Sequence, residues 1–372
     1  MKRICNVILV LILVGIFFFW NGSEYGDTRV NHETITFVRA KVLKVLEDHR
    51  EEKYPNLYVG SQRILVEMEG EKYTEPLEIV NILSTESSVP VEAGDRIIVT
   101  ADEPEGIEPY YTVYNYDRSM PLVLILILFL TLLYLVGRKQ GMLSILALLV
   151  SVYIIFCLMI PAIYMGASPI LMAVLTCILC SVYSTLILYG YTTLSKINLL
   201  AVTGAFLVGA GIFLFVSRLL HLSGYQMTDV EGLLLIADDT GMQLTGLLFV
   251  GVAVAAYGAA KDVSVSISSA LEEIAEVDPN ADRHSLFMAG MRMGRNIIGT
   301  MVDTLFFAFL GGSLTTILIY ISYGVGPRQI INSNLLAVEF TMSIVSTAVL
   351  IVLVPITSYI SARYYGNKNI LH

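Results

Sequence analysis

Long apolar runs separated by short polar segments fill the chain from residue 121 to residue 360. An α-helix needs about 20 mostly apolar residues to cross a bilayer, and each run is near that length. A further run near the N-terminus extends from Ile4 to Trp20. The later helices are expected at 121–136, 142–165, 168–190, 198–220, 243–260, 297–321 and 335–360. The pattern therefore predicts an α-helical polytopic membrane protein with about eight transmembrane helices.

The stretch from 28 to 118 has a different pattern, in which apolar and polar residues alternate. Alternation with a period of two is typical of a β-strand that buries one face. Turn residues separate these runs at short intervals. The expected strands lie within 36–42, 63–67, 96–100 and 110–114. We therefore expect a small extracytoplasmic β-barrel of the OB or SH3 type between the first and second transmembrane helices.

These patterns divide the chain into four parts. Lys2 and Arg3 precede the first apolar run, and no small-x-small cleavage pattern follows it. This run is therefore expected to be an uncleaved signal anchor. The expected parts are the anchor at 1–20, the extracytoplasmic β domain at 21–119, a seven-helix membrane domain at 120–363 and a cytoplasmic tail at 364–372.

The composition supports the bilayer as the solvent for most of the chain. Hydrophobic residues make up 55% and charged residues 15%, with a mean hydropathy of +0.71, which excludes a cytosolic enzyme. The net charge is −9, and residues 21–119 hold 20 acidic against 10 basic residues. Neither part has the basic excess that phosphate backbones require, so we expect no nucleic-acid partner. The sequence has no nucleotide, metal or nucleophile motif, so we expect no cofactor, no metal and no enzymatic activity.

Basic residues are distributed unevenly between alternate loops. If the N-terminus is cytoplasmic, the short external loops contain only Arg218 and Arg328. The internal segments then hold Lys2, Arg3, Arg138, Lys139, Lys196, Lys261, Arg283, Arg292, Arg295, Arg363 and Lys368. Because Lys and Arg in short loops stay in the cytoplasm, we expect both termini inside the cell and the β domain outside it.

Asp262 is the first candidate for function, because a charge inside a bilayer costs roughly 2.5 to 3.5 kcal/mol on insertion scales. It ends a helical stripe of small and polar residues formed by Gly251, Ala255, Gly258, Ser266 and Ser269. Such a stripe lets a neighbouring helix approach closely, and it would direct the acid into the bundle. The alternative is that Asp262 caps its span at the inner interface, beside Lys261.

Asp303 is the second candidate. Helical geometry gathers it on one side with Gly299, Arg292, Arg295, Asn296, Phe306 and Leu310. Asp303 lies about 10 Å beyond Asn296 along the axis, which places it inside the hydrocarbon. There it would pair with Arg295 or stay protonated and hydrogen-bonded.

Glu339 opens the last span near the outer interface, where snorkelling or capping is the simpler explanation. Two loops complete the set of candidates. Residues 221–242 hold four acids and no Lys or Arg, so this loop draws cations to a pore mouth or is simply a solvated loop. Residues 264–295 are first rich in Ser and then acidic, and after Pro279 they become basic. This pattern predicts two helical pieces joined by a turn at the proline.

Residues 290–301, with the sequence Gly-Met-Arg-Met-Gly-Arg-Asn-Ile-Ile-Gly-Thr-Met, resemble a signature of the YibE/F family of bacterial membrane proteins. Further pieces similar to the family pattern lie at 137–141, 262–273, 311–314 and 354–357. An extracytoplasmic domain that precedes the spans resembles the architecture of the longer, YibE-like branch of the family. The resemblance implies a multi-pass protein of the bacterial cell membrane, without an established activity, and suggests a YibF-like paralogue or a second copy as the partner.

Four positions depart from the family pattern. Lys261 stands where Met is usual, and Asn296 where Asp is usual. Asp303 stands where Asn is usual, and Met342 where Arg is usual. The acid therefore lies about two turns deeper than in the pattern, and a family-wide role for an Arg-Asp pair does not transfer directly to this chain.

Two functions fit these observations. In the first, the protein is a small-solute or ion transporter or permease component, and Asp262, Asp303 and the two arginines line a path between the sixth and seventh spans. In the second, it is a non-transporting membrane scaffold or subunit whose outer β domain binds a partner or an envelope component. Small-residue stripes such as Ala201, Ala205 and Gly209 support helix association in either case.

Overall fold

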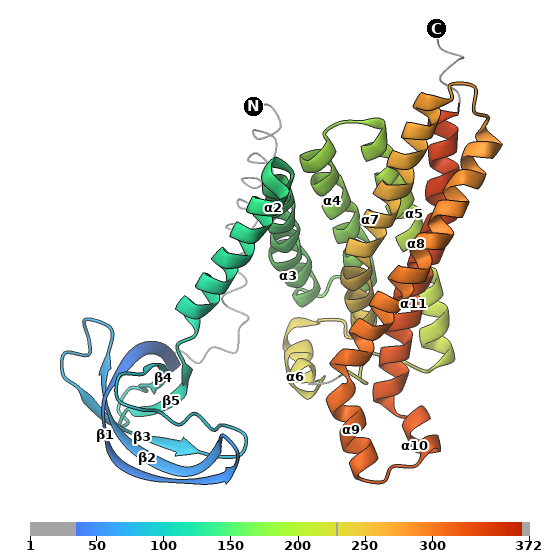
Figure 1. The fold of residues 1–372 in the computed structure, drawn as a ribbon. Helices are drawn as coiled ribbons and strands as arrows, with labels where there is room; N and C mark the ends of the chain where they lie inside the picture. The colour runs from blue at the N-terminus through green and yellow to red at the C-terminus, as the bar shows by residue number, and fades with distance from the viewer. Residues whose placement is uncertain (1–34, 228–229, 367–372) are drawn as a thin grey trace. The chain divides into compact units, whose positions relative to one another are not determined.

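The computed structural model describes residues 35–227 and 230–366, so the expected signal anchor lies outside the described residues. The chain divides into two compact units, one formed by residues 26–135 and the other by 1–25 with 136–372. Each unit is described by itself below. The first contains a β-sheet and the start of a long helix, and the second contains a helical bundle (Figure 1).

The β unit is one antiparallel sheet of five strands in the order β3-β2-β1-β4-β5. The strands are β1 (Ile35–Tyr54), β2 (Leu57–Met68), β3 (Leu77–Leu83), β4 (Arg96–Asp102) and β5 (Tyr110–Tyr116). Three register shifts along the β1–β2 pair let the 20-residue β1 bend, so that the sheet curls around its core (Figure 1). Among the described residues no ladder joins β3 to β5, so the sheet is a half-barrel and not the closed barrel that the sequence suggested.

Alternation along the strands builds the core of the half-barrel. Val42, Ile64, Val66, Ile97 and Val99 are each fully buried, and neighbouring residues on the same strands face outward. Four of the five strands were expected from this alternation. The β3 strand was missed because its alternation is irregular: Asn81 is buried, whereas Val80 and Ile82 are exposed.

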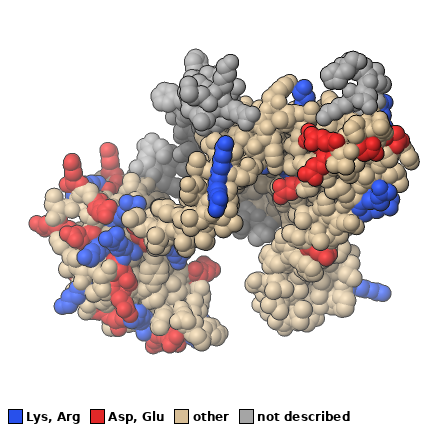
Figure 2. Space-filling model, turned by 45° about the horizontal axis from the view of Figure 1, so that its top comes forward, with Lys and Arg blue, Asp and Glu red and all other residues tan. Residues whose placement is uncertain are grey.

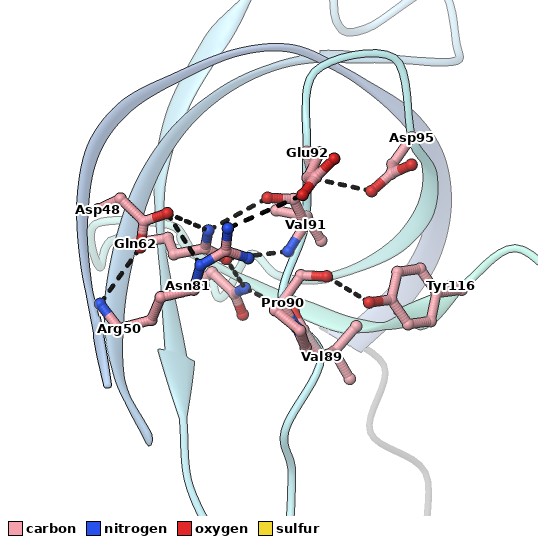
Figure 3. A network of polar contacts seen from close by, with 10 residues as sticks. All are labelled: Asp48, Arg50, Gln62, Asn81, Val89, Pro90, Val91, Glu92, Asp95 and Tyr116. Atoms are coloured by element: carbon pink, nitrogen blue, oxygen red, sulfur yellow. Dashed lines mark hydrogen bonds and ion pairs between the residues drawn. The ribbon is translucent and has the colours of Figure 1, made fainter. Parts of the chain in front are cut away.

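A polar network fastens the segment between β3 and β4 to the curled sheet (Figure 3). The Gln62 side chain is fully buried; its amide nitrogen donates to the Val91 carbonyl at 3.1 Å, and its oxygen accepts the Val91 N–H at 2.9 Å. The Asn81 amide nitrogen donates to the Val89 carbonyl at 2.9 Å and to Gln62 at 3.3 Å. These buried amides therefore replace the strand pairing that this segment lacks.

The sheet leads directly into the first described helix. Only Asp117 and Arg118 separate β5 from α2 (Ser119–Ile154). The Asp117 carboxylate accepts the Ser119 N–H at 3.0 Å and lies 3.6 Å from the Arg39 guanidinium of β1. Hydrogen bonding from Ser119 lowers the pKa of Asp117, so this junction stays charged at neutral pH.

The helical run of α2 is interrupted at Arg138, whose backbone (φ 46°, ψ −127°) is not helical. The division between the two compact units falls just before this point. The remaining elements are η1 (Ile155–Met159), α3 (Ile160–Tyr164), α4 (Pro169–Tyr189), α5 (Thr193–Leu219), α6 (Val230–Thr240), α7 (Leu247–Val277), α8 (Arg283–Gly312), α9 (Leu314–Ser322), α10 (Pro327–Ile331) and α11 (Asn334–Tyr365). The predicted pair of helical pieces around Pro279 is confirmed as α7 and α8.

The core of the bundle lies around α11, which packs against α5, α7 and α8. Small residues allow these approaches. A Cβ atom at Gly294 would lie 2.2 Å from the Val354 side chain, and one at Gly209 would lie 2.4 Å from Val349. Close backbone approach of this kind drives helix association in lipid, where the hydrophobic effect does not act between helices.

Five helical stretches among the described residues are long and apolar enough to cross a membrane. The count is six if α8 and α9, bent by 54° at their junction, form one broken span. The expected spans at 168–190, 198–220, 243–260 and 335–360 coincide with α4, α5, α7 and α11. The two spans expected at 121–136 and 142–165 lie in one helical stretch of 46 residues, interrupted at Arg138.

Candidate functional site

Two close contacts fix the register of α8 against α11. Gly290 lies against Ser358, and Gly294 lies against Val354, so the two helices are antiparallel. Nine residues further along α8, Asp303 lies level with Val345, close to the middle of α11. The Phe306 and Phe340 rings, 6.1 Å apart, agree with this register. Asp303 therefore lies near the middle of the membrane-spanning bundle.

One side of α8 is not covered by the rest of the described chain. We call it the α8 outer face. It consists of the exposed residues Arg292, Arg295, Asn296, Gly299, Thr300, Asp303, Thr304, Phe307, Ala308, Gly311 and Gly312. Their spacing of three to four residues is that of a single helical face. The sequence-based grouping is thus reproduced for Asp303, Arg292, Arg295, Asn296 and Gly299. It is wrong for Phe306 and Leu310, which are half-buried and line a pocket beside α11.

The expected direction of that side was wrong. Asp303 faces outward from the bundle and is exposed. Within 35–227 and 230–366 no ion pair involves Asp303, Arg292 or Arg295. The reason is that Gly290 and Gly294 face α11, which turns the opposite side of α8 away from the bundle.

Asp262 is also exposed, as are Ala255, Gly258 and Ser266 of its predicted stripe. The buried side of α7 is instead formed by Val252, Ala256, Ala260, Val263 and Ile267. The two acids therefore lie on outward faces of separate helices, and neither is one of the buried acids that a path through this chain requires. The prediction of buried acidic residues is wrong for the described part of the chain.

Glu339 is half-buried and lies elsewhere. It lines a small, mostly apolar pocket beside the bend between α8 and α9, together with Phe306, Leu310, Ser313 and Phe340. The pocket brings Glu339 near the bend between α8 and α9, but away from the α8 outer face.

The interior of the bundle contains hydroxyl and amide groups instead of charges. The Asn198 side chain donates to Ser181 at 3.0 Å, and Ser268 and Ser361 lie 3.2 Å apart between α7 and α11. All four residues are buried. Their role as links between helices is visible only once the helices are packed.

Charged residues cover the β unit, whereas most of the surface of the helical bundle is uncharged (Figure 2). Within the β unit the Glu103 carboxylate accepts hydrogen bonds from Lys72, from Tyr111 at 2.8 Å and from Tyr73 at 3.2 Å. The bond from Lys72 lowers the pKa of Glu103. Burial and the bond to Glu103 raise the pKa of Tyr111 to about 12. No cluster of three potential metal-binding side chains occurs among the described residues.

A comparison with protein families matches residues 125–367, more than half of the chain, to the family described as YibE/F-like protein. The match covers the helical bundle and excludes the five strands. No curated protein and no solved structure is significantly similar to this chain.

Proposed function

The chain belongs to the YibE/F family, and we propose that it is a subunit of a membrane assembly, in which the α8 outer face packs against another transmembrane helix. The observation that carries this proposal is the position of Asp303. A carboxylate near the middle of a bilayer is costly when it faces lipid, by roughly 2.5 to 3.5 kcal/mol on insertion scales. A neighbouring protein removes that cost by supplying hydrogen-bond partners or by sheltering a protonated carboxyl group.

The small residues of the α8 outer face favour a second copy as the neighbour. Thr300, Thr304, Ala308 and Gly312 recur every four residues and are all exposed. The two threonine hydroxyls donate to carbonyls of their own helix, at 3.0 Å and 2.9 Å, and present a smooth surface. Small-xxx-small faces pack closely against an identical parallel helix, and two copies inserted in the same orientation have parallel α8 helices.

The β unit supplies the second part of the proposal. Its strands lie outside the family match, which covers the helical bundle. We infer that the sheet is the recruiting module, which binds a partner or an envelope component on the external side. Its acidic surface, with 20 Asp and Glu against 10 Lys and Arg in residues 21–119, favours a basic ligand.

The proposed topology has eight spans and cytoplasmic termini. The 46-residue stretch Ser119–Tyr164 is about 69 Å long at 1.5 Å per residue, which is twice the thickness of a hydrocarbon core of about 30 Å. It is interrupted at Arg138, beside Lys139, where a cytoplasmic turn would place two basic residues. Counted as two spans, and with the apolar run 4–20, it completes the set of eight.

Cross-linking in native membranes tests the subunit proposal. A Thr304→Cys variant is expected to form disulfide-linked dimers on mild oxidation, whereas Gly211→Cys, at an exposed position of α5, is not. Gly299→Leu should weaken dimerisation at least tenfold, equivalent to about 1.4 kcal/mol. Gly211→Leu is the matched control, because a Cβ atom meets nothing within 4 Å at either glycine. Equal dimer fractions in the two leucine variants would contradict the proposal.

A conduit between two copies is the second candidate function. It is favoured by the presence of Asn296, Asp303 and two arginines on the same face that we propose to be covered. Asp303→Asn should preserve the dimer, since an amide retains hydrogen-bonding capacity. Loss of solute or ion flux in proteoliposomes containing this dimeric variant would support the conduit. Unchanged flux would contradict the conduit, and the scaffold function would then be the one that remains.

A further inference from the structure

Two hollows open at the end of the bundle where α8 begins and α11 ends. One is lined by Arg283, His284, Phe287, Tyr359, Ala362 and Arg363. The other is lined by Leu200, Tyr359, Ile360, Arg363 and Tyr364. They lie side by side and share Tyr359 and Arg363 of α11, and we call the two hollows together the basic groove.

The lining of the basic groove is cationic. Arg283, His284 and Arg363 are exposed, and no Asp or Glu belongs to the described lining of either hollow. Neither arginine takes part in an ion pair within the part of the chain that the structure describes. The nearest acid in sequence, Asp282, is engaged in capping α8, where it accepts the N–H groups of His284 at 3.2 Å and Ser285 at 3.3 Å.

The groove also lies at the depth where lipid headgroups are found. The apolar run of α11 ends at Ile360, and Arg363 follows within the last turn. Gly366, which follows α11, lies against the Arg283 side chain, so the two arginines are at the same end of the bundle. Tyr359 and Tyr364 are exposed there, as tyrosines are in the aromatic belts of membrane proteins, and exposed Leu200 continues the groove along α5 towards the hydrocarbon.

We propose that the basic groove binds the phosphate headgroup of an anionic phospholipid. Arg283 and Arg363 present guanidinium forks that match phosphate oxygens, and the tyrosine hydroxyls are additional donors. Leu200 and Ile360 provide the apolar wall along which the acyl chain leaves the headgroup. Basic pockets between membrane helices suit such headgroups, and this groove combines the charge with an apolar exit.

Binding is measured with the full-length protein in neutral detergent, titrated with phosphatidylglycerol, with phosphatidylcholine or with inorganic phosphate, and followed by the thermal unfolding midpoint. Phosphatidylglycerol is expected to raise the midpoint, and phosphatidylcholine is not. The double variant Arg283→Gln/Arg363→Gln should weaken apparent phosphatidylglycerol affinity at least tenfold. Arg218→Gln, an exposed arginine in the last turn of α5, is the matched control and should bind as the wild type does.

A second variant keeps the test independent of folding. Arg283→Lys/Arg363→Lys retains both charges and should keep part of the affinity, because only the fork geometry is lost. Equal stabilisation by phosphatidylglycerol and phosphatidylcholine would overturn the proposal. So would equal stabilisation by inorganic phosphate at the same concentration, since a free anion would then be the ligand. The α8 outer face plays no part in these measurements, so the result does not depend on the proposed dimer.

Discussion

At the scale of single residues, orientation decides what an ionisable group can do. Asp303 lies level with the central part of α11, but it faces away from the bundle. Glu103 shows the opposite case, because three donors converge on it within the β unit. A carboxylate held in this way is stabilised in its charged form, and stability becomes linked to pH.

The pH dependence of the β unit follows from these groups. The folded-state pKa of Glu103 is lowered from 4.5, so its contribution to stability is present above that value and is lost as the pH falls through the lower, folded-state pKa. The pKa of Tyr111 is raised from 10.0 to about 12, so its contribution is lost as the pH rises through about 12. Protease resistance of the β unit should therefore fall at both extremes.

Glu103→Gln is expected to lower the protease resistance of the β unit at neutral pH and to make that resistance less dependent on pH at acidic values. Limited proteolysis of the full-length protein across a pH series measures both changes. Glu105→Gln is the control, because Glu105 is exposed two residues away. If protease resistance falls identically at low pH in the two variants, Glu103 is not the cause of the fall.

Sequence reasoning identified the residues that share one side of α8 but not the direction of that side. Helical geometry fixes which residues share a side, whereas the neighbours of a helix decide which side is buried. The missing signal was Gly290 and Gly294, four residues apart, which mark the side that approaches α11. The basic groove was missed because its residues come from three helices and were considered only for their charge.

At the scale of elements, the close contact between α8 and α11 can be tested by adding a single methyl group to it. Gly294→Ala should destabilise the protein by about 1 to 3 kcal/mol, because a Cβ atom there would lie 2.2 Å from buried Val354. Gly211→Ala, at an exposed position inside α5, should be neutral or stabilising, because a Cβ atom there meets nothing within 4 Å and alanine favours helices. Thermal unfolding in detergent measures both changes.

A second-site change separates overpacking from other effects of Gly294→Ala. Val354→Ala removes the atoms that the new methyl group would meet, so the double variant should recover part of the lost stability. If the two single effects simply add, the contact between Gly294 and Val354 is not the cause.

At the scale of the whole molecule, hydropathy predicted the class of fold well, because crossing a bilayer demands long apolar helices whatever their neighbours are. It separated α4, α5, α7 and α11 correctly. It could not foresee the open edges of the sheet. Those features depend on contacts between segments that are distant in sequence.

The proposed topology predicts which loops are accessible from outside the cell. Gln329→Cys, in the α10 segment, should react with a membrane-impermeant maleimide in intact cells. Asn280→Cys, in the exposed turn between α7 and α8, should react only after permeabilisation. The wild-type chain reports the background from its own cysteines, and the reverse labelling pattern would show that the orientation is inverted.

The two-residue junction between β5 and α2 leaves no slack between the sheet and the helix that follows it. With Arg39 of β1 and Ser119 of α2 both held by Asp117, the joint is braced on either side. A force on the sheet would therefore be transmitted to α2, because no flexible linker separates them. The sheet and the start of α2, which belong to one compact unit, are therefore expected to move together.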